Sequence, residues 1–235
     1  MNYLIIGASR GLGALFAQSL PHAGDTVWLV ARSQPDLTDT DGVKRIWIQA
    51  DLADANAARQ ITQVLQNQTL DVCLYNAGIW ETDAFSDRYD FEAVADDELE
   101  RILHVNLTAA MQITQKMLIP LRRSSNGKII FIGSNAGLEN SGRPEVAYVV
   151  SKFGLRGLTH ALRKLVQKDA IGVTCINLGD VGEVVFEEGQ FLARHSGERP
   201  LIALNDIVTM LQAVIALSNT SCVKEIDLLA MTDDI

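Results

Sequence analysis

A tyrosine and a lysine four residues apart are the side chains best suited to chemistry in this chain. Tyr148 and Lys152 fall in a stretch with a helical pattern, so their side chains would share one face. A lysine ammonium about 5 Å from a phenol, at an effective dielectric constant of ~20, stabilises the phenolate by roughly 3 kcal/mol. That would prepare Tyr148 for proton transfer to or from a carbonyl oxygen. Taken alone, the spacing favours a half-buried tyrosine beside a surface lysine.

A glycine-rich turn near the start of the chain is suited to holding a dinucleotide. Gly7, Gly11 and Gly13 follow the short apolar run Tyr3–Ile6 and precede a helical pattern. Glycines allow positive φ and a close approach of backbone N–H groups to a pyrophosphate, which the N-terminus of the next helix also attracts. The G-x-x-x-G-x-G spacing differs from the commoner G-x-G-x-x-G. An ordinary tight turn is the alternative.

The residues after the second apolar run indicate which dinucleotide would bind. Thr26–Ala31 is followed by Arg32, and the nearest acids are Asp25 and Asp36, so no carboxylate is placed to bind a free ribose 2′-hydroxyl. Arg10 and Arg32 are both placed to reach a 2′-phosphate. Charge-assisted hydrogen bonds contribute roughly 1.5–3 kcal/mol each. After solvent screening, the pair would favour NADP over NAD by about 2–4 kcal/mol, or ~30- to 1000-fold.

Alternating short apolar runs and helical patterns would position these residues. The runs are nearly continuous in apolar residues, as in parallel strands that are covered on both faces. The sequence therefore predicts an α/β fold: a single-domain, doubly wound Rossmann fold spanning 1–235, with about seven parallel strands and helices on both faces. The expected strands are Tyr3–Ile6, Thr26–Ala31, Arg45–Ala50, Asp71–Tyr75, Gly127–Gly133, Gly172–Asn177 and Lys224–Leu229, and the expected helices are 12–23, 54–68, 95–123, 147–169 and 205–218.

Composition limits the classes of function. The chain has 235 residues, of which 48% are hydrophobic and 21% charged, so it can bury a core without a disulfide or metal. Its net charge of −9 argues against binding to nucleic acid or to an anionic membrane. The three cysteines match neither a disulfide framework nor a zinc site, so no metal is expected. Without a leader or a long apolar segment, we expect a cytoplasmic protein.

Two stretches break the alternation of strands and helices. Residues 79–98 carry eight acids, and we expect a solvated loop and helix start there, capped by Asp96 or Asp97. Residues 179–204 have weak periodicity and follow a strand end, where a substrate lid would lie.

Six motifs, in order along the chain, resemble those of the short-chain dehydrogenase/reductase superfamily. The resemblance runs from Gly7 to about Leu229. The matching pieces are the Gly7/Gly11/Gly13 turn, Asp51-Leu52, Asn76-Ala77-Gly78, Val105-Asn106, Ile132-Gly133-Ser134 with Gly137, and Tyr148-Val149-Val150-Ser151-Lys152.

The resemblance implies an NADP(H)-dependent oxidoreductase that interconverts a carbonyl and an alcohol on a small molecule. Tyr148 would exchange a proton with the substrate oxygen, and Ser134 would hydrogen-bond that oxygen. Lys152 would stabilise the Tyr148 phenolate and bind the nicotinamide ribose, while Asn106 would anchor a water that relays protons to Lys152. The residues expected to bind the cofactor are Gly7, Ser9, Arg10, Gly11, Leu12, Gly13, Arg32, Asp51, Leu52, Asn76, Ala77, Gly78, Tyr148, Lys152, Gly179 and Val181.

Some features depart from the family pattern. Leu178 stands where the family usually has proline, and Glu183 where it has a threonine that helps to hold the nicotinamide. Acids at 183–188 either belong to a solvated lid or disfavour anionic substrates. The departures motivate an alternative, a non-catalytic NADP-binding regulatory or signalling protein, against which the intact serine, tyrosine and lysine argue. The family commonly pairs subunits through its long helices, which implies a homodimer or homotetramer.

Overall fold

Seven apolar segments form one parallel sheet in the computed structural model, which describes residues 1–37, 40–139, 142–194 and 200–233. The strand order is β3-β2-β1-β4-β5-β6-β9, and every neighbouring pair is parallel. The predicted fold class is confirmed, and each predicted strand is present to within one or two residues. The strands are β1 (Asn2–Ile6), β2 (Thr26–Ala31), β3 (Lys44–Gln49), β4 (Val72–Tyr75), β5 (Lys128–Ile132), β6 (Gly172–Leu178) and β9 (Glu225–Leu228).

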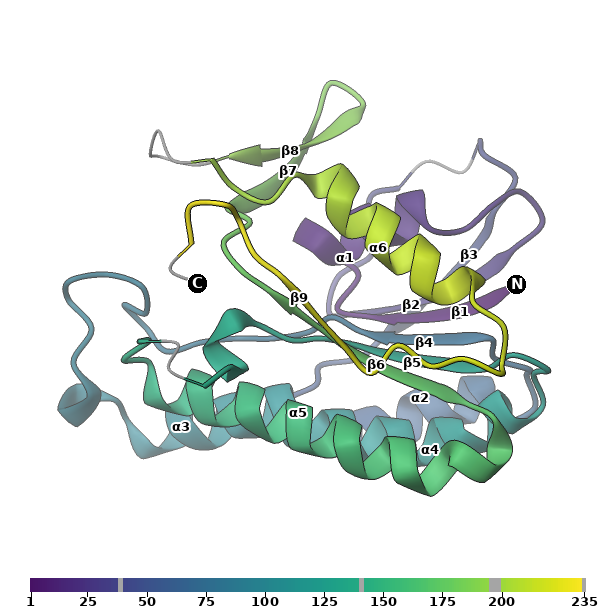
Figure 1. The fold of residues 1–235 in the computed structure, drawn as a ribbon, viewed down its shortest axis with the longest axis horizontal. Helices are drawn as coiled ribbons and strands as arrows, with labels where there is room; N and C mark the ends of the chain where they lie inside the picture. The colour runs from purple at the N-terminus through teal and green to yellow at the C-terminus, as the bar shows by residue number, and fades with distance from the viewer. Residues whose placement is uncertain (38–39, 140–141, 195–199, 234–235) are drawn as a thin grey trace.

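Helices cover both faces of this sheet (Figure 1). One layer holds α2 (Ala57–Leu65), α3 (Asp96–Leu103), α4 (Ala109–Arg122) and α5 (Val146–Val166), and the other holds α1 (Gly11–Ser19) and α6 (Leu204–Ala216). Two apolar cores follow, one on each face of the sheet, and alternate residues of the central strands point into one or the other. Being covered on both faces explains why these strands are continuous in apolar residues.

The order of the strands fixes where a ligand can bind. β1 lies between β2 and β4, so the connections leaving β1 and β4 turn to opposite sides of the sheet. Open α/β sheets bind ligands in the crevice at such a switch point, beyond the carboxyl ends of the strands.

The cysteines of β4 and β6 are buried in the core and do not reach this crevice. Burial raises the pKa of the Cys73 thiol to about 12 and that of the Cys175 thiol to about 11, which makes both residues inert.

The helix expected at 95–123 is interrupted at its centre. A π-helical turn, His104–Thr108, separates α3 from α4. The expected cap is wrong: Ala95 occupies the N-cap position, and Asp96, Asp97 and Glu98 lie in the first turn of α3. Acids in that turn favour the helix through its dipole rather than by capping.

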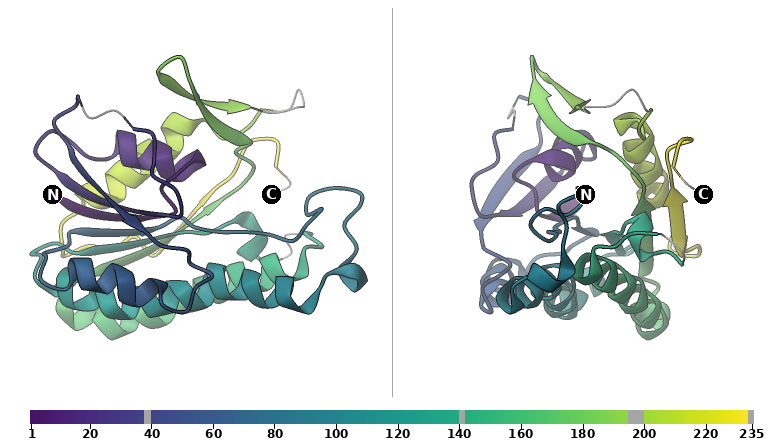
Figure 2. Two further views of the ribbon diagram at one scale, coloured as in Figure 1. Left: turned by 180° about the vertical axis from the view of Figure 1, so that it is seen from behind. Right: turned by 90° about the vertical axis from the view of Figure 1, so that its left-hand side faces the viewer.

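The expectation of a solvated acidic segment at 79–98 is wrong for Glu81, which is 1% exposed. A second difference lies in the expected lid, where β7 (Glu183–Glu187) and β8 (Gln190–Arg194) form an antiparallel hairpin. The hairpin stands above the layer of α1 and α6 and contacts both helices (Figure 2). Residues 195–199 of the expected lid lie outside the described residues.

Within the described part of the chain, no helix is long and apolar enough to cross a membrane. Exposed apolar side chains occur on the two long helices expected to pair subunits, and this pairing stays a prediction. The exposed apolar side chains on α4 and α5 are Met111, Ile119, Val146, Val150, Phe153 and Leu165.

Candidate active site

The glycine turn packs so closely that side chains cannot replace its hydrogens. Gly7 has φ +84°, and a Cβ there would lie 2.9 Å from the backbone of Ala77. A Cβ on Gly13 would lie 1.9 Å from the Gly7 carbonyl oxygen, which also accepts a hydrogen bond of 3.2 Å from Asn76 Nδ2. A Cβ on Gly11, by contrast, would meet no atom within 4 Å. The turn is therefore fixed against the end of β4 on one side and open on the other.

The N-terminus of α1 is suited to binding an anion. This helix begins at Gly11, and its first turn contains no acid. No side chain caps its N-terminus, so the first N–H groups stay available to a ligand. These features fit the pyrophosphate of a dinucleotide.

A cleft of about 950 Å³ runs from this turn across the ends of β1, β4 and β5. It brings together all but two of the predicted site residues. Those that line it are Gly7, Ser9, Arg10, Gly11, Leu12, Arg32, Asp51, Leu52, Asn76, Ala77, Gly78, Ser134, Tyr148, Lys152, Gly179 and Val181. Gly13 and Asn106 stand behind this lining, the first under the turn and the second beside Gly78.

Lys152 reaches the centre of the cleft from α5. Its Nζ lies 5.5 Å from the centre of the Tyr148 ring and donates a hydrogen bond of 3.1 Å to the Ile132 carbonyl at the end of β5. A Cβ on Gly78 would lie 3.5 Å from this Nζ and 3.8 Å from Asn106 Oδ1. The absence of a side chain at Gly78 thus leaves space beside the ammonium. The structure places a buried cation beside a phenol that lines an open cleft.

Asn106 ties three elements of the site together. Its Oδ1 accepts a hydrogen bond from Ile79 N (2.8 Å), and its Nδ2 donates to the Ile79 carbonyl (2.7 Å) and to Ser151 Oγ (2.9 Å). Ser151 Oγ in turn donates to the Tyr148 carbonyl (2.7 Å). The π turn that carries Asn106 is a form often found at functional sites. Asn106 therefore holds the chain after β4 against the turn of α5 that carries Tyr148.

Ser134 enters the cleft from the end of β5. It precedes a short 3₁₀ turn, Asn135–Gly137, and its Oγ accepts a hydrogen bond of 3.2 Å from Ala136 N. A Cβ on Gly137 would lie 3.0 Å from the Lys152 backbone, so glycine allows this turn to approach α5 closely. Ser134 and Tyr148 then line the same cleft from different elements.

The end of the cleft at the glycine turn carries the two predicted arginines. Arg10 and Arg32 are both exposed, and neither forms an ion pair within the described ranges. Asp51 lies at this end too, where its Oδ1 accepts a hydrogen bond of 3.0 Å from Ala53 N. The guanidinium groups of Arg10 and Arg32 therefore remain available to a phosphate. Leu178 and Glu183, which depart from the family pattern, also line the cleft.

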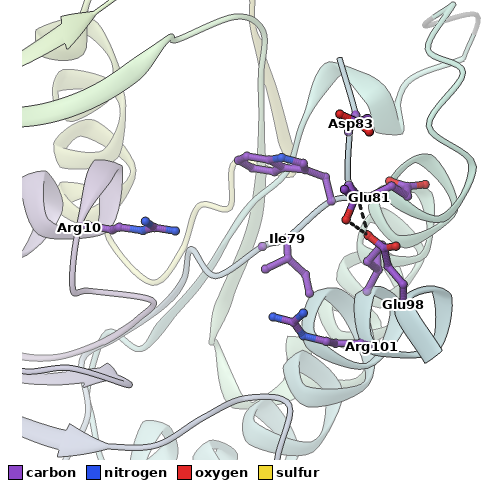
Figure 3. Close-up of a pocket in the computed structure, with 11 residues that line it drawn as sticks. Arg10, Ile79, Glu81, Asp83, Glu98 and Arg101 are labelled. Carbon is purple, nitrogen blue, oxygen red and sulfur yellow. Dashed lines mark hydrogen bonds between the residues drawn. The ribbon is translucent and has the colours of Figure 1, made fainter. Parts of the chain in front are cut away.

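Sequence reasoning missed the side chains at the mouth of the cleft. Trp80 and Phe85 pack edge-to-face on Tyr148, with ring centres 6.3 and 5.5 Å away. Arg143 lies over the Phe85 ring and pairs with Asp180 at 2.8 Å. A smaller cavity of about 360 Å³ adjoins this mouth; Arg101 lies next to Ile79 there, and Arg10 extends toward them from the glycine turn (Figure 3). One sequence signal could have found Trp80 and Phe85: they follow closely after Gly78, which was predicted to bind the cofactor.

Comparisons with known proteins find a matching family and several relatives. The model of the short chain dehydrogenase family matches residues 2–188. A 3-oxoacyl-[acyl-carrier-protein] reductase of rhamnolipid biosynthesis from Pseudomonas aeruginosa is 32% identical over 188 residues, which cover 75% of this chain and 71% of the relative. A ketoacyl reductase, HetN, from Nostoc is 31% identical over 188 residues, which cover 77% of this chain and 63% of that relative. These matches thus span about two thirds of each relative.

The structure is also similar to that of an alcohol dehydrogenase from the archaeon Thermococcus sibiricus, solved with 5-hydroxy-NADP. The TM-score is 0.81 at 21% identity, and the match covers 100% of this chain and 98% of the other. At this identity the likeness concerns the fold.

Proposed function

Because the chain belongs to the short chain dehydrogenase family of oxidoreductases, we propose that it transfers a hydride between NADP(H) and the carbonyl or alcohol carbon of a small molecule. The observation that carries this proposal is the placement of Lys152 Nζ 5.5 Å from the Tyr148 ring, in a cleft that begins at the glycine turn. The named relatives are reductases of 3-oxoacyl or ketoacyl groups, which supports a carbonyl substrate.

The residues of the cleft fit NADP. The glycine turn and the start of α1 would hold the pyrophosphate, and Arg10 and Arg32 would hold the 2′-phosphate. Leu52 and Asp51 would border the adenine, and Lys152 would bind the nicotinamide ribose. The bound nicotinamide supplies the hydride chemistry.

The protein supplies the proton and the geometry. Tyr148 Oη would give its proton to the substrate oxygen during reduction and recover one during oxidation. The Lys152 ammonium, whose Nζ lies 5.5 Å from the centre of the Tyr148 ring, would stabilise the phenolate left behind. Ser134 would donate a hydrogen bond to the same oxygen and hold it in line. Asn106 would anchor a water that returns a proton to Lys152.

The test is a screen of NADPH oxidation with aldehydes, ketones and quinones, run beside a direct measurement of NADPH binding. We expect turnover with at least one class of carbonyl compound and preference for NADPH over NADH. Tight NADPH binding without turnover of any compound would instead support a non-catalytic NADP-binding protein.

Substitution of Gly13 tests whether the glycine turn binds the pyrophosphate. Because a Cβ at this position would lie 1.9 Å from the Gly7 carbonyl oxygen, Gly13→Ala must displace the turn. We expect at least a ~10-fold loss of NADPH affinity, measured by nicotinamide fluorescence, since each tenfold corresponds to about 1.4 kcal/mol. Gly157→Ala is the matched control, because a Cβ there would meet no atom within 4 Å. Equal affinities for the two variants would refute the assignment.

The charge at the cleft mouth should influence the choice of substrate. Glu183 is exposed and lines the cleft, whereas Glu187 of the same strand pairs with Arg194. A carboxylate about 8 Å from Glu183 would be repelled by ~0.5–2 kcal/mol at effective dielectric constants of 80 to 20. We therefore expect kcat/KM to be several-fold higher for a ketone ester than for its free acid. Glu183→Gln should reduce this ratio of the two kcat/KM values. Comparable turnover of acid and ester would rule this out.

A further inference from the structure

Two buried glutamates lie beside the proposed site without a part in the mechanism above. Glu81, in the loop after β4, is 1% exposed, and Glu145, at the start of α5, is 2% exposed. Within the described ranges neither forms an ion pair, and one oxygen of each, Oε2, is buried without a hydrogen-bond partner. Burial of an unpaired carboxylate is unfavourable unless its other contacts offset the lost hydration. Those other contacts therefore indicate what the two residues do.

Glu81 binds the start of the helix that carries Tyr148. Its Oε1 accepts hydrogen bonds from Ala147 N (2.7 Å) and, at 3.3 Å, from Tyr148 N. The preceding amide, Val146 N, donates to Tyr89 Oη (3.0 Å), and this hydroxyl lies 3.5 Å from Glu81 Oε1. Three consecutive N–H groups of α5 are thus satisfied from the loop that runs from 79 to 89. A carboxylate at this position also interacts favourably with the helix dipole.

Glu145 makes the reciprocal contact. It occupies the N-cap position of α5, but its side chain does not cap that helix. Its Oε1 instead accepts a hydrogen bond from Phe85 N (2.9 Å) in the loop. The loop therefore holds the helix through Glu81 and Tyr89, and the helix holds the loop through Glu145. We call these three residues the clamp.

The clamp holds a loop whose backbone is otherwise unfavourable. Asp83 and Phe85 both have φ +62°, a region that non-glycine residues rarely adopt. Such conformations persist where the surroundings impose them, and they gather at functional sites. The bond from Phe85 N to Glu145 imposes one of them. A second anchor is Glu98 of α3, which faces the loop (Figure 3) and accepts hydrogen bonds from Thr82 N and Oγ1.

The held loop presents two aromatic rings beside Tyr148. Trp80 is 55% exposed and Phe85 is 46% exposed, yet each packs edge-to-face on Tyr148 and on the other, with their own ring centres 5.6 Å apart. Exposed aromatic rings in a fixed arrangement at the mouth of a cleft form an apolar wall. An apolar or flat substituent of a substrate would lie against this wall while its carbonyl faces Tyr148.

We propose that Glu81 and Glu145 are positioning residues, whose carboxylates fix the start of α5 and the loop so that Tyr148, Trp80 and Phe85 form one rigid substrate wall. The substrate class that follows is a carbonyl compound with an apolar or aromatic group next to the carbonyl. The part of this proposal that concerns substrates rests on the proposed function. The arrangement of the aromatic rings can be measured without any turnover.

The experiment compares Glu81→Ala, Glu81→Gln and Glu145→Ala with Asp87→Asn, which removes an acid from an exposed position of the same loop. Near-ultraviolet circular dichroism reports the aromatic cluster, and Trp80→Phe identifies the band that belongs to it. We expect both alanine variants to lose this band while far-ultraviolet spectra and NADPH affinity stay unchanged. Glu81→Gln retains an acceptor oxygen for both amides and should retain most of the band.

The kinetic arm uses an aryl ketone and a short alkyl ketone that the wild type reduces. Because a displacement of about 1 Å at a reacting group can cost ~100-fold, we expect kcat for the aryl ketone to fall at least ~10-fold in Glu81→Ala. In Glu81→Gln, kcat for the aryl ketone should lie within ~3-fold of the wild-type value. In Glu145→Ala, the ratio of kcat/KM for the aryl ketone to that for the alkyl ketone should fall. If Glu81→Ala does not fold, Tyr89→Phe, which keeps the ring, takes its place.

Two results would overturn the proposal. One is an unchanged aromatic band in both alanine variants, and the other is kinetics indistinguishable from those of Asp87→Asn. Wild-type protein that reduces no carbonyl compound refutes the proposed function instead, and the spectra alone then decide whether the clamp positions the rings.

Discussion

Replacement of Tyr148 by phenylalanine should lower kcat/KM for carbonyl reduction by about 10²- to 10⁴-fold, the usual contribution of a positioned general acid. This corresponds to about 3–5 kcal/mol of transition-state stabilisation. The ring of Tyr148 packs on Trp80 and Phe85, and phenylalanine keeps these contacts. NADPH affinity should therefore change little, and the loss should appear in kcat.

The measurement is steady-state kinetics with the best substrate from the carbonyl screen, together with NADPH titration. Tyr3→Phe is the matched control, since the Tyr3 hydroxyl contacts Met1 Sδ and its ring belongs to a buried core outside the lining of the cleft. A kcat in Tyr148→Phe within ~3-fold of the wild type would show that another group supplies the proton, because a general acid normally contributes much more.

Removal of both predicted arginines of the cleft should abolish the preference for NADPH over NADH. Arg10 and Arg32 line the cleft and form no ion pair within the described ranges, so their charges are available to a 2′-phosphate. The double variant Arg10→Ala/Arg32→Ala should lose about 2–4 kcal/mol of discrimination, which is a ~30- to 1000-fold fall in the ratio of the two affinities.

Only the affinity for NADPH should fall, because NADH has no 2′-phosphate. The double variant Arg59→Ala/Lys168→Ala controls for the loss of two positive charges, since both residues are exposed and lie outside the lining of the cleft. An unchanged ratio in the double variant would place the 2′-phosphate elsewhere.

The fold was predictable because the central strands are covered on both faces. Segments such as Thr26–Ala31 and Val72–Tyr75 must be continuous in apolar residues to fill two cores at once, so their bounds stand out from the polar turns around them. The cleft followed from the same logic. Residues directly after these strands, such as Asn76 and Ser134, meet at one edge of a parallel sheet.

The loop between β4 and α3 was not predictable by this reasoning. A run of acids normally lies in water, and nothing local marks Glu81 as different from Asp87. Glu81 is buried because its partners are amides of α5, more than sixty residues away along the chain. The π turn at Asn106 is similarly imposed, because the bonds of its side chain to Ile79 and Ser151 cross between elements. Long-range hydrogen bonds of this kind leave no periodic signal.

The hairpin β7–β8 was missed for a different reason. Its strands are only five residues long and show no regular alternation of half-buried and exposed positions, and they pair with each other instead of with the main sheet. Such short strands are hard to tell from loop by pattern alone. Whether this segment closes over a substrate stays a prediction.

Transfer of deuterium from NADPH labelled at the transferable position of the nicotinamide tests the central claim most directly. We expect the wild type to place deuterium on the carbinol carbon of the product alcohol, with one label for each NADPH oxidised, as judged by mass spectrometry. Tyr148→Phe should bind labelled NADPH normally and form the same labelled alcohol far more slowly. Oxidation of NADPH without label in the alcohol, or an equal rate of labelling in both proteins, would contradict the assignment of hydride transfer with Tyr148 as the proton donor.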